Sequence, residues 1–252
     1  MQKYGQHFLI NPSVIQQIVD ASWILRQDQL VEIGPGKGAL TSALLARGFK
    51  GFTTVEIDPV MATYLFEMFP AQSGLKIVCQ NFLDFDLNSL DGLSTQFVSN
   101  LPYIDAAEIL DKVLAWKFFK TAVFMFQKEQ AQKITAKPGD DLYGPLSVFS
   151  QLRAHISLVC NVGKGCFNPP PKVDSRVLAF EHKEFPVVLF ERLRRVVSAA
   201  FLHRRKTLLN ALCLGGKEKE KIIFALESLH KPLTVRPEQL SPQEYLQLTE
   251  LI

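Results

Sequence analysis

The chain has 252 residues, of which 47% are hydrophobic and 21% charged, and its formal net charge is +3. This is an ordinary globular composition, and the length allows one large domain or a main domain with a smaller one. No apolar run approaches the roughly 18 residues of a membrane span, and the first seven residues lack the apolar core of a secretory signal, so we expect a cytoplasmic protein.

The first elements expected along the chain are an arm and a helix. Residues 6–9 (Gln-His-Phe-Leu) are expected to form a docking arm, and Asn11 followed by Pro12 predicts a capped helix. Strands are then expected at 30–33, 51–57, 75–79, 96–99 and 120–126, and helices at 38–47, 59–68 and 105–115. Strands that alternate with helices predict an α/β fold with a doubly wound, mostly parallel sheet.

The later part of the chain has a different pattern. Segments 154–162 and 173–182 are strand-like, and the Pro-rich link between them is too short for a helical crossover. We therefore expect an antiparallel pair at one edge of the sheet. After Pro186, apolar residues recur at helical spacing. The sequence thus predicts a main domain at 1–183 and a small C-terminal helical domain at 184–252.

A glycine-rich turn at residues 34–38 (Gly-Pro-Gly-Lys-Gly) joins the first of these strands to a helix. Glycines let the backbone pass close to a ligand, and the free amides of a helix N-terminus favour polar groups. The spacing is neither that of the dinucleotide fingerprint nor that of a P-loop. The turn therefore predicts a different ligand site, at Gly34 and Gly36.

Two polar residues lie at the ends of the next two strands. Glu56 can accept hydrogen bonds from both ribose hydroxyls of a nucleoside cofactor, although a surface carboxylate is the alternative. Asn81 can read an adenine edge, with Phe82 stacked on the ring, although an ordinary turn asparagine is the alternative. With the glycine-rich turn, these residues predict a nucleoside cofactor.

The tetrapeptide Asn100-Leu101-Pro102-Tyr103 follows the fourth strand. The Asn100 amide oxygen and the Leu101 carbonyl can accept the hydrogens of an exocyclic base amine, and Tyr103 offers an aromatic face. A strand-ending turn is the alternative, since Asn and Pro are common in turns. Next to a turn suited to a methyl donor, the tetrapeptide predicts methylation of a base amine.

The chemistry expected at this site is positioning and electrostatics. The ring of the base withdraws the lone pair of the amine, and hydrogen-bond acceptors for the amine hydrogens favour a pyramidal, more nucleophilic nitrogen. Tyr103 is expected to stack on a base turned out of its helix, with Phe167 closing the other side. Core packing is the alternative for Phe167. No metal is expected, because the five histidines are scattered and the four cysteines form no Cys-x-x-Cys pair.

Charge is uneven along the chain. Residues 1–180 carry 16 basic and 16 acidic residues, whereas residues 181–252 carry 12 and 9. Six basic residues stand in one stretch without an acid: Arg192, Arg194, Arg195, Arg204, Arg205 and Lys206. The last three are predicted to contact an RNA phosphate backbone, and a solvated helix face is the alternative.

Taken together, the motifs resemble the small-subunit ribosomal RNA adenine dimethyltransferases, a family that includes the bacterial kasugamycin-resistance enzyme. The resemblance covers essentially the whole chain. Its blocks are Gly5 to Leu9, Glu32 to Thr41, Val55 to Asp58, Asn100 to Tyr103, Gln127 to Glu129, Tyr143 to Val148, Phe167 to Ser175 and Ala200 to Leu208. It implies a Rossmann-like methyltransferase domain and S-adenosylmethionine as methyl donor.

The resemblance also implies a substrate: two adjacent adenosines near the 3′ end of small-subunit rRNA, each dimethylated within a pre-ribosomal particle. We expect a monomer with no membrane partner. By the same resemblance, His7 and Leu9 line the donor pocket, Gly34 lies beneath the methionine part, Asn81 meets the adenine, and Asn100 joins donor and acceptor sites. Three departures from the family pattern occur at His7, at Asn81 and at residues 104–108.

Three alternatives stay open at the level of sequence. A nicotinamide-dependent oxidoreductase is disfavoured by the glycine spacing and the tetrapeptide. A non-catalytic rRNA-binding assembly factor is kept open by the three departures. A sister family methylates a large-subunit adenine, but Leu101, the Pro-rich block at 169–175 and residues 204–207 favour the small-subunit branch.

Overall fold

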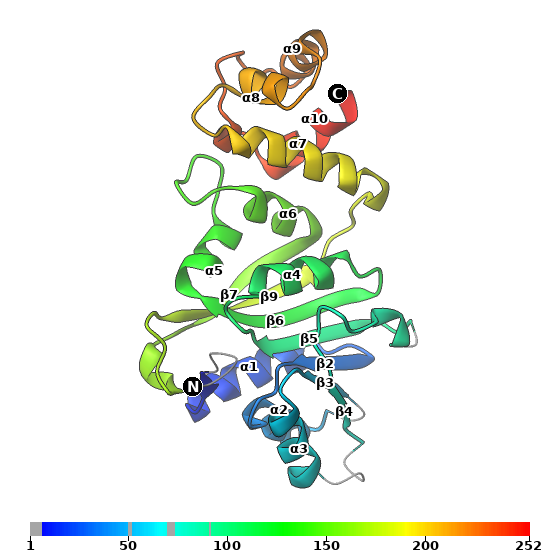
Figure 1. The fold of residues 1–252 in the computed structure, drawn as a ribbon, viewed down its shortest axis with the longest axis vertical. Helices are drawn as coiled ribbons and strands as arrows, with labels where there is room; N and C mark the ends of the chain where they lie inside the picture. Colours follow the sequence, from blue (N-terminus) through cyan, green and yellow to red (C-terminus); the bar gives the residue numbers. More distant parts are fainter. Residues whose placement is uncertain (1–6, 50–51, 70–73, 91) are drawn as a thin grey trace. The chain divides into compact units, whose positions relative to one another are not determined.

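The structure is a computed structural model that describes residues 7–49, 52–69, 74–90 and 92–252. Gly5, Gln6 and Gly51, which the sequence placed in the arm and in a strand, lie outside the described residues. The described part of the chain falls into two compact units. The first comprises Met1–Ala131 and His155–His182, and the second Gln132–Ala154 and Lys183–Ile252 (Figure 1).

The first unit is built on a twisted sheet. Within the described residues this sheet has seven strands, in the order β4-β3-β2-β5-β6-β9-β7. They are β2 (Gln29–Ile33), β3 (Thr53–Glu56), β4 (Lys76–Cys79), β5 (Thr95–Asn100), β6 (Phe119–Gln127), β7 (Ala154–Val162) and β9 (Ser175–His182). Neighbours from β4 to β6 are parallel, and β9 is antiparallel to β6. The predicted doubly wound sheet with an antiparallel edge is confirmed, and strand ends differ from prediction by only a few residues.

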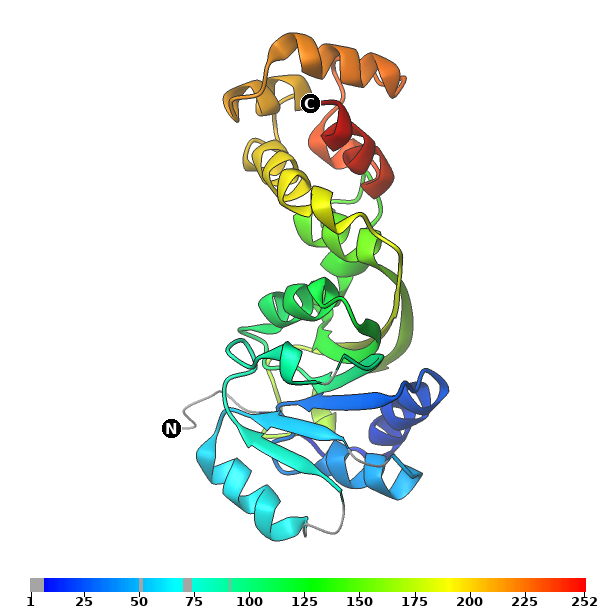
Figure 2. The ribbon, with the colours of Figure 1, turned by 90° about the vertical axis from the view of Figure 1, so that its right-hand side faces the viewer.

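Helices cover both faces of this sheet (Figure 2). They are α1 (Pro12–Ile24), α2 (Ala39–Arg47), α3 (Pro59–Met68) and α4 (Ala106–Ala115). The N-cap signals act as expected, because Asn11 accepts from the Val14 amide at 3.1 Å and Asp58 from the Val60 amide at 3.0 Å. Apolar residues of α1 and α2 form one cluster with alternate residues of β5 and β6, whereas α4 packs on the opposite face.

A two-stranded pairing holds the N-terminal arm. Strand β1 (Phe8–Leu9) runs antiparallel to β8 (Phe167–Asn168), with Leu9 opposite Phe167. Two-residue strands are too short to show a period-2 pattern, so the sequence did not predict them. The pairing fixes the arm beside the carboxyl ends of the central strands.

The second unit is helical. Its helices are α6 (Pro145–Arg153), α7 (Phe190–Leu202), α8 (Leu208–Leu214), α9 (Lys219–Ser228) and α10 (Pro242–Leu251), and α5 (Lys128–Thr135) crosses the boundary between the units. The boundary expected near residue 183 left out Gln132–Ala154. Those residues join the second unit because Tyr143, Val148 and Leu152 share its apolar core, where the Tyr143 hydroxyl donates to the Leu240 carbonyl at 2.8 Å.

None of the helices in the described ranges has the length and apolar character to cross a membrane.

Candidate active site

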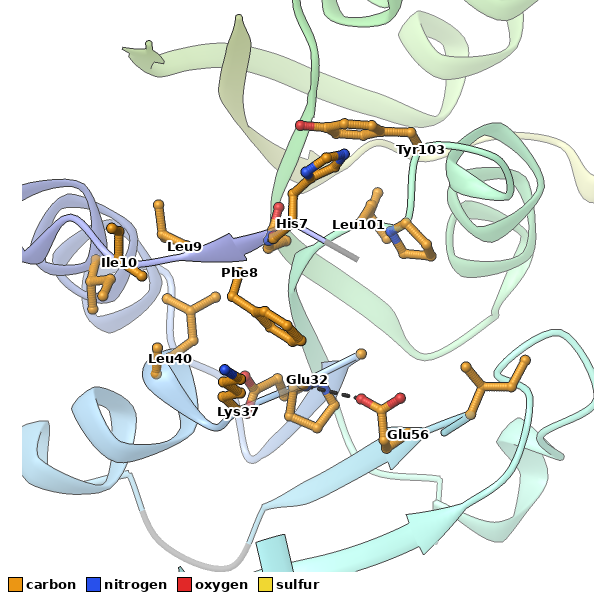
Figure 3. Close-up of a pocket in the computed structure, with 18 residues that line it drawn as sticks. His7, Phe8, Leu9, Ile10, Glu32, Lys37, Leu40, Glu56, Leu101 and Tyr103 are labelled. Carbon is orange, nitrogen blue, oxygen red and sulfur yellow. Dashed lines mark hydrogen bonds between the residues drawn. The ribbon is translucent and has the colours of Figure 1, made fainter. Parts of the chain in front are cut away.

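A cavity of about 350 Å³ opens at the carboxyl ends of β2, β3 and β5 in the first unit. Figure 3 shows the rings of Tyr103 and His7 on one side of it and the carboxyl groups of Glu32 and Glu56 on the other, with Phe8 between them. The cavity brings together nine of the predicted site residues: His7, Leu9, Gly34, Gly36, Glu56, Asn100, Leu101, Pro102 and Tyr103. Segments distant in the sequence thus meet at one site, as the carboxyl ends of parallel strands do in doubly wound folds.

The glycine-rich turn forms the floor of this cavity. Gly34 and Gly36 have φ angles of +63° and +55°, a region that side chains other than glycine rarely adopt. A Cβ atom on Gly36 would approach the Phe8 ring to 3.0 Å, whereas nothing lies within 4 Å of one on Gly34. At Gly34 the turn therefore offers bare backbone beneath open space, which suits the close approach of a ligand, whereas the Phe8 ring lies over Gly36.

Glu56 is held with its carboxylate toward the cavity. The side chain is 2% exposed, and its two oxygens accept from the amides of Gly36 and Asp58, each at 2.9 Å. Burial raises the pKa of Glu56, and these two amide hydrogen bonds oppose the shift. Each carboxylate oxygen has a second acceptor position. The group can therefore take two hydroxyl donors side by side.

Glu32 is a second carboxyl group in the cavity, and the sequence motifs did not indicate it as a site residue. It is 1% exposed and accepts from the Thr41 hydroxyl at 2.7 Å. Burial, with a smaller contribution from the charge of Glu56, raises the pKa of Glu32 to about 8. The sequence signal that could have indicated Glu32 is an acidic residue within an otherwise apolar strand, expected at 30–33, and this strand ends directly before Gly34.

This raised pKa makes stability depend on pH. The native pKa of about 8 lies above the ordinary value of 4.5, so the folded protein binds an extra proton between these values. The free energy of unfolding should therefore fall as pH rises through this window. Glu32→Gln keeps an oxygen for Thr41 and removes the titration. Its unfolding free energy relative to wild type should rise by up to about 1.4 kcal/mol per pH unit.

Urea unfolding of both proteins between pH 5 and 8 measures this difference. Glu56 also has a raised pKa and contributes to both profiles, so the difference between them isolates Glu32. Parallel profiles would show that Glu32 titrates in the native protein as it does in the unfolded chain.

The tetrapeptide is tied to the N-terminal arm through Asn100. The Asn100 side-chain nitrogen donates to the His7 carbonyl at 3.0 Å. Only the amide nitrogen can donate to a carbonyl, so this contact fixes the amide orientation and leaves the Asn100 oxygen as an acceptor. The next residue is fixed through its backbone, since the Leu101 amide donates to the Met125 carbonyl at 3.3 Å.

Tyr103 is held by one contact of its hydroxyl and one contact of its ring. Its hydroxyl lies 3.1 Å from the Ser175 hydroxyl, and its ring centroid lies 5.8 Å from that of His7, with the planes tilted by 30°. His7 in turn donates from Nδ1 to the Pro169 carbonyl at 2.9 Å. The arm, the tetrapeptide and the segment after β8 therefore form one connected network beside the cavity.

Two predicted site residues do not line the cavity. Asn81 lies two residues beyond β4, and its side-chain oxygen accepts from the Leu83 amide at 2.9 Å. Phe167 is 3% exposed and belongs to the apolar cluster beneath Leu9. The expectation that Phe82 is free to stack on a base was wrong, because its ring is 4% exposed and packs among other aromatic side chains.

The predicted RNA-contacting residues differ in their surroundings. Within the second unit, the Arg204 guanidinium donates to the carbonyls of Asp141 at 2.7 Å and Asp140 at 3.2 Å, and it lies 3.8 Å from Glu238. Arg205 and Lys206 are exposed. The contacts of Arg204 hold a loop of its own unit. Of the three predicted residues, Arg205 and Lys206 are therefore the more accessible to RNA.

In the part of the chain that the structure describes, no group of three or more His, Cys, Asp and Glu side chains could hold a metal ion.

Comparison with known proteins identifies the family. All 252 residues, 1–252, match the family model described as "Ribosomal RNA adenine dimethylase". The small-subunit ribosomal RNA methyltransferase A of Malacoplasma penetrans (strain HF-2) is 36% identical over 251 residues, which are 98% of this chain and 90% of the relative.

Two solved structures extend the likeness to three dimensions. A dimethyladenosine transferase from Plasmodium falciparum has a TM-score of 0.81 at 27% identity, covering 96% of each chain. The 23S rRNA methyltransferase ErmE has a TM-score of 0.74 at 27% identity, covering 96% of this chain and 98% of its own. The resemblance seen in the sequence is confirmed, and the chain belongs to the ribosomal RNA adenine dimethylase family.

Proposed function

We propose that this protein transfers methyl groups from S-adenosylmethionine to the exocyclic amines of two adjacent adenosines near the 3′ end of small-subunit rRNA. The observation that carries the proposal is that one cavity joins the glycine-rich turn and Glu56 to the Asn100–Tyr103 tetrapeptide. The small-subunit methyltransferase name of the relative from Malacoplasma penetrans supports the choice of substrate.

The donor side of the cavity fits a nucleoside with a charged amino-acid tail. Gly34 leaves space for the methionine part over bare backbone, Gly36 allows the Phe8 ring to lie close to the turn, and His7 and Leu9 line the side wall. Glu56 has acceptor positions for the ribose hydroxyls. Asn81 lies outside the cavity lining and its side-chain oxygen accepts from the Leu83 amide, so we assign its side-chain nitrogen to the adenine edge. When bound, the donor supplies a methyl group on a sulfonium, which is already a good leaving group and needs no protein nucleophile.

The acceptor side activates the target amine. The Asn100 oxygen and the Leu101 carbonyl accept hydrogen bonds from the amine, which would direct the nitrogen lone pair toward the donor's methyl carbon. Formation of the nitrogen–carbon bond would be matched by cleavage of the methyl carbon–sulfur bond, with the sulfur leaving as a neutral thioether. The proton is released to solvent after transfer. Tyr103 stacks on the base, and the contacts of its ring with His7 and Ser175 preorganise that face. Phe167 holds the arm in this arrangement through the pairing of β8 with β1.

The second unit supplies contacts to the RNA backbone. Arg205 and Lys206 are exposed, whereas Arg204 is engaged within the unit. The double variant Arg205→Ala, Lys206→Ala should bind rRNA more weakly, with a slope of log affinity against log salt that is shallower by about 0.7–0.9 per lost phosphate contact. Filter binding at several salt concentrations measures this slope.

The matched control removes two exposed cations from α9, as Lys219→Ala with Lys221→Ala. It changes the net charge equally and should leave the slope near that of wild type. Equal slopes for all three proteins would show that Arg205 and Lys206, in the turn between α7 and α8, are solvated surface residues without an RNA contact.

We further propose that the protein acts as a monomer on a pre-ribosomal particle in the cytoplasm. Mass spectrometry of dimethyladenosine in rRNA from cells with and without the gene tests the function. Loss of the modification from small-subunit rRNA is expected. Loss from large-subunit rRNA would favour the activity named for ErmE, and no change in either rRNA would favour a non-catalytic assembly factor.

A further inference from the structure

The loop after β4 is closed around a single ammonium group. The Lys112 side chain of α4 donates to the carbonyls of Phe82 at 2.8 Å, Leu83 at 2.6 Å and Phe85 at 2.7 Å. A lysine ammonium has three N–H donors, so these contacts saturate it. The same group lies 5.3 Å from the centre of the Phe82 ring. Lys112 is therefore a half-buried cation whose three donors are all engaged by one loop.

The conformation of this loop depends on that cation. Three carbonyl oxygens converge on one point, and their dipoles would repel one another without a positive charge between them. Burial lowers the pKa of Lys112, and the carboxylates of Asp84 and Asp86 oppose the shift. Removing the ammonium should therefore open the loop rather than leave an equivalent packed state.

The loop begins beside the donor pocket. The Gln80 amide donates to the Glu56 carbonyl at 2.9 Å, and Asn81 follows directly. The Asn81 carbonyl accepts from the Asp84 amide at 3.0 Å, within the turn that Lys112 holds. A shift of this turn therefore moves the Asn81 side chain relative to Glu56.

We propose that Lys112 is a positioning residue for the methyl donor: through the carbonyls of residues 82, 83 and 85 it holds the turn that begins at Asn81, so that the Asn81 side-chain nitrogen can reach the donor's adenine. This inference rests on the proposed function. It also connects two parts of the active site, because α4 begins three residues after Tyr103 in the chain and carries the cation that orders the donor loop.

The test replaces Lys112 with methionine, which has a similar length and no donor. Affinity for S-adenosylhomocysteine, measured by titration calorimetry, should fall roughly tenfold, the equivalent of about one hydrogen bond. The KM for the donor should rise by a similar factor while kcat stays within about twofold. Amide hydrogen exchange of residues 83–86 should become faster even without ligand.

A double-mutant cycle separates positioning from general stability. If Lys112 acts through Asn81, then adding Asn81→Ala to Lys112→Met should cause no further loss of affinity, whereas independent effects would add. Lys117→Met is the matched control, because Lys117 follows α4, is exposed and lies 4.8 Å from the centre of the Phe118 ring, away from the loop that Lys112 binds. It should leave affinity and exchange unchanged.

Each outcome decides the inference. Unchanged affinity in Lys112→Met, or additive losses in the cycle, would overturn it while the proposed function stands. If Lys112→Met fails to fold, Asn81→Ala alone decides. Unchanged affinity in Asn81→Ala would show that Asn81 does not contribute to donor binding, and Lys112 could then not act through it. Failure of the wild-type protein to bind S-adenosylhomocysteine would instead refute the proposed function.

Discussion

Replacing Asn100 with alanine should lower methyl transfer to small-subunit rRNA by roughly two to three orders of magnitude, the usual effect of losing one transition-state hydrogen-bond partner. The contact between its side-chain nitrogen and the His7 carbonyl leaves the amide oxygen as an acceptor at the cavity. Without that oxygen, the target amine loses an acceptor that favours its pyramidal, nucleophilic form.

Single-turnover transfer of labelled methyl groups to small-subunit particles that lack the modification measures this rate. Binding of the particles should change much less than the rate. Ser175→Ala is a useful control, because it removes only the hydroxyl that lies 3.1 Å from that of Tyr103 and should have less than about a tenfold effect. Near-normal turnover in Asn100→Ala would refute the assignment of Asn100.

Replacing Glu56 with alanine should weaken donor binding by about 1.5–3 kcal/mol, or roughly 10- to 150-fold, as expected for charge-assisted hydrogen bonds to a ribose. The buried carboxylate is fixed by the amides of Gly36 and Asp58, so its remaining acceptor positions are preorganised. Calorimetric titration with S-adenosylhomocysteine measures the loss.

A ligand analogue makes this test specific. The 2′-deoxy form of S-adenosylhomocysteine should bind wild type more weakly than the parent compound, and the two should bind Glu56→Ala almost equally. Asp58→Ala controls for a nearby carboxylate: it removes the cap of α3 but keeps the backbone amide that orients Glu56. Equal sensitivity of both proteins to the 2′-hydroxyl would show that Glu56 does not contact the ribose.

The sequence by itself determined the local features of this protein. Asp58 followed by Pro59 starts a helix because an N-cap acceptor and a fixed proline φ act within one turn. Gly34 and Gly36 adopt positive φ angles because glycine has no Cβ, and this too is a property of the residue itself. The alternation of strands and helices was enough to predict the sheet. Short motifs at strand ends were enough to predict most of the cavity lining, because parallel strands end at a common edge.

Tertiary structure alone decided the features that depend on distant contacts. The sequence could not show that Glu32 is enclosed enough to raise its pKa to about 8, since burial is set by the elements around it. Nor could it separate Arg204, which binds carbonyls some 63 residues away, from the exposed Arg205. The same holds for Lys112, whose three acceptors lie 27 to 30 residues earlier.

The physical reason is the range over which each effect acts. Backbone preferences and caps involve neighbours within about four residues, so their signals are present in short stretches of sequence. Burial, charge pairing and carbonyl ligation require the folded sheet to bring separate segments together. That is why the sequence placed Asn100 and Glu56 at strand ends, whereas only the fold showed that Phe167 lies in the core and that Gln132–Ala154 packs with the C-terminal helices.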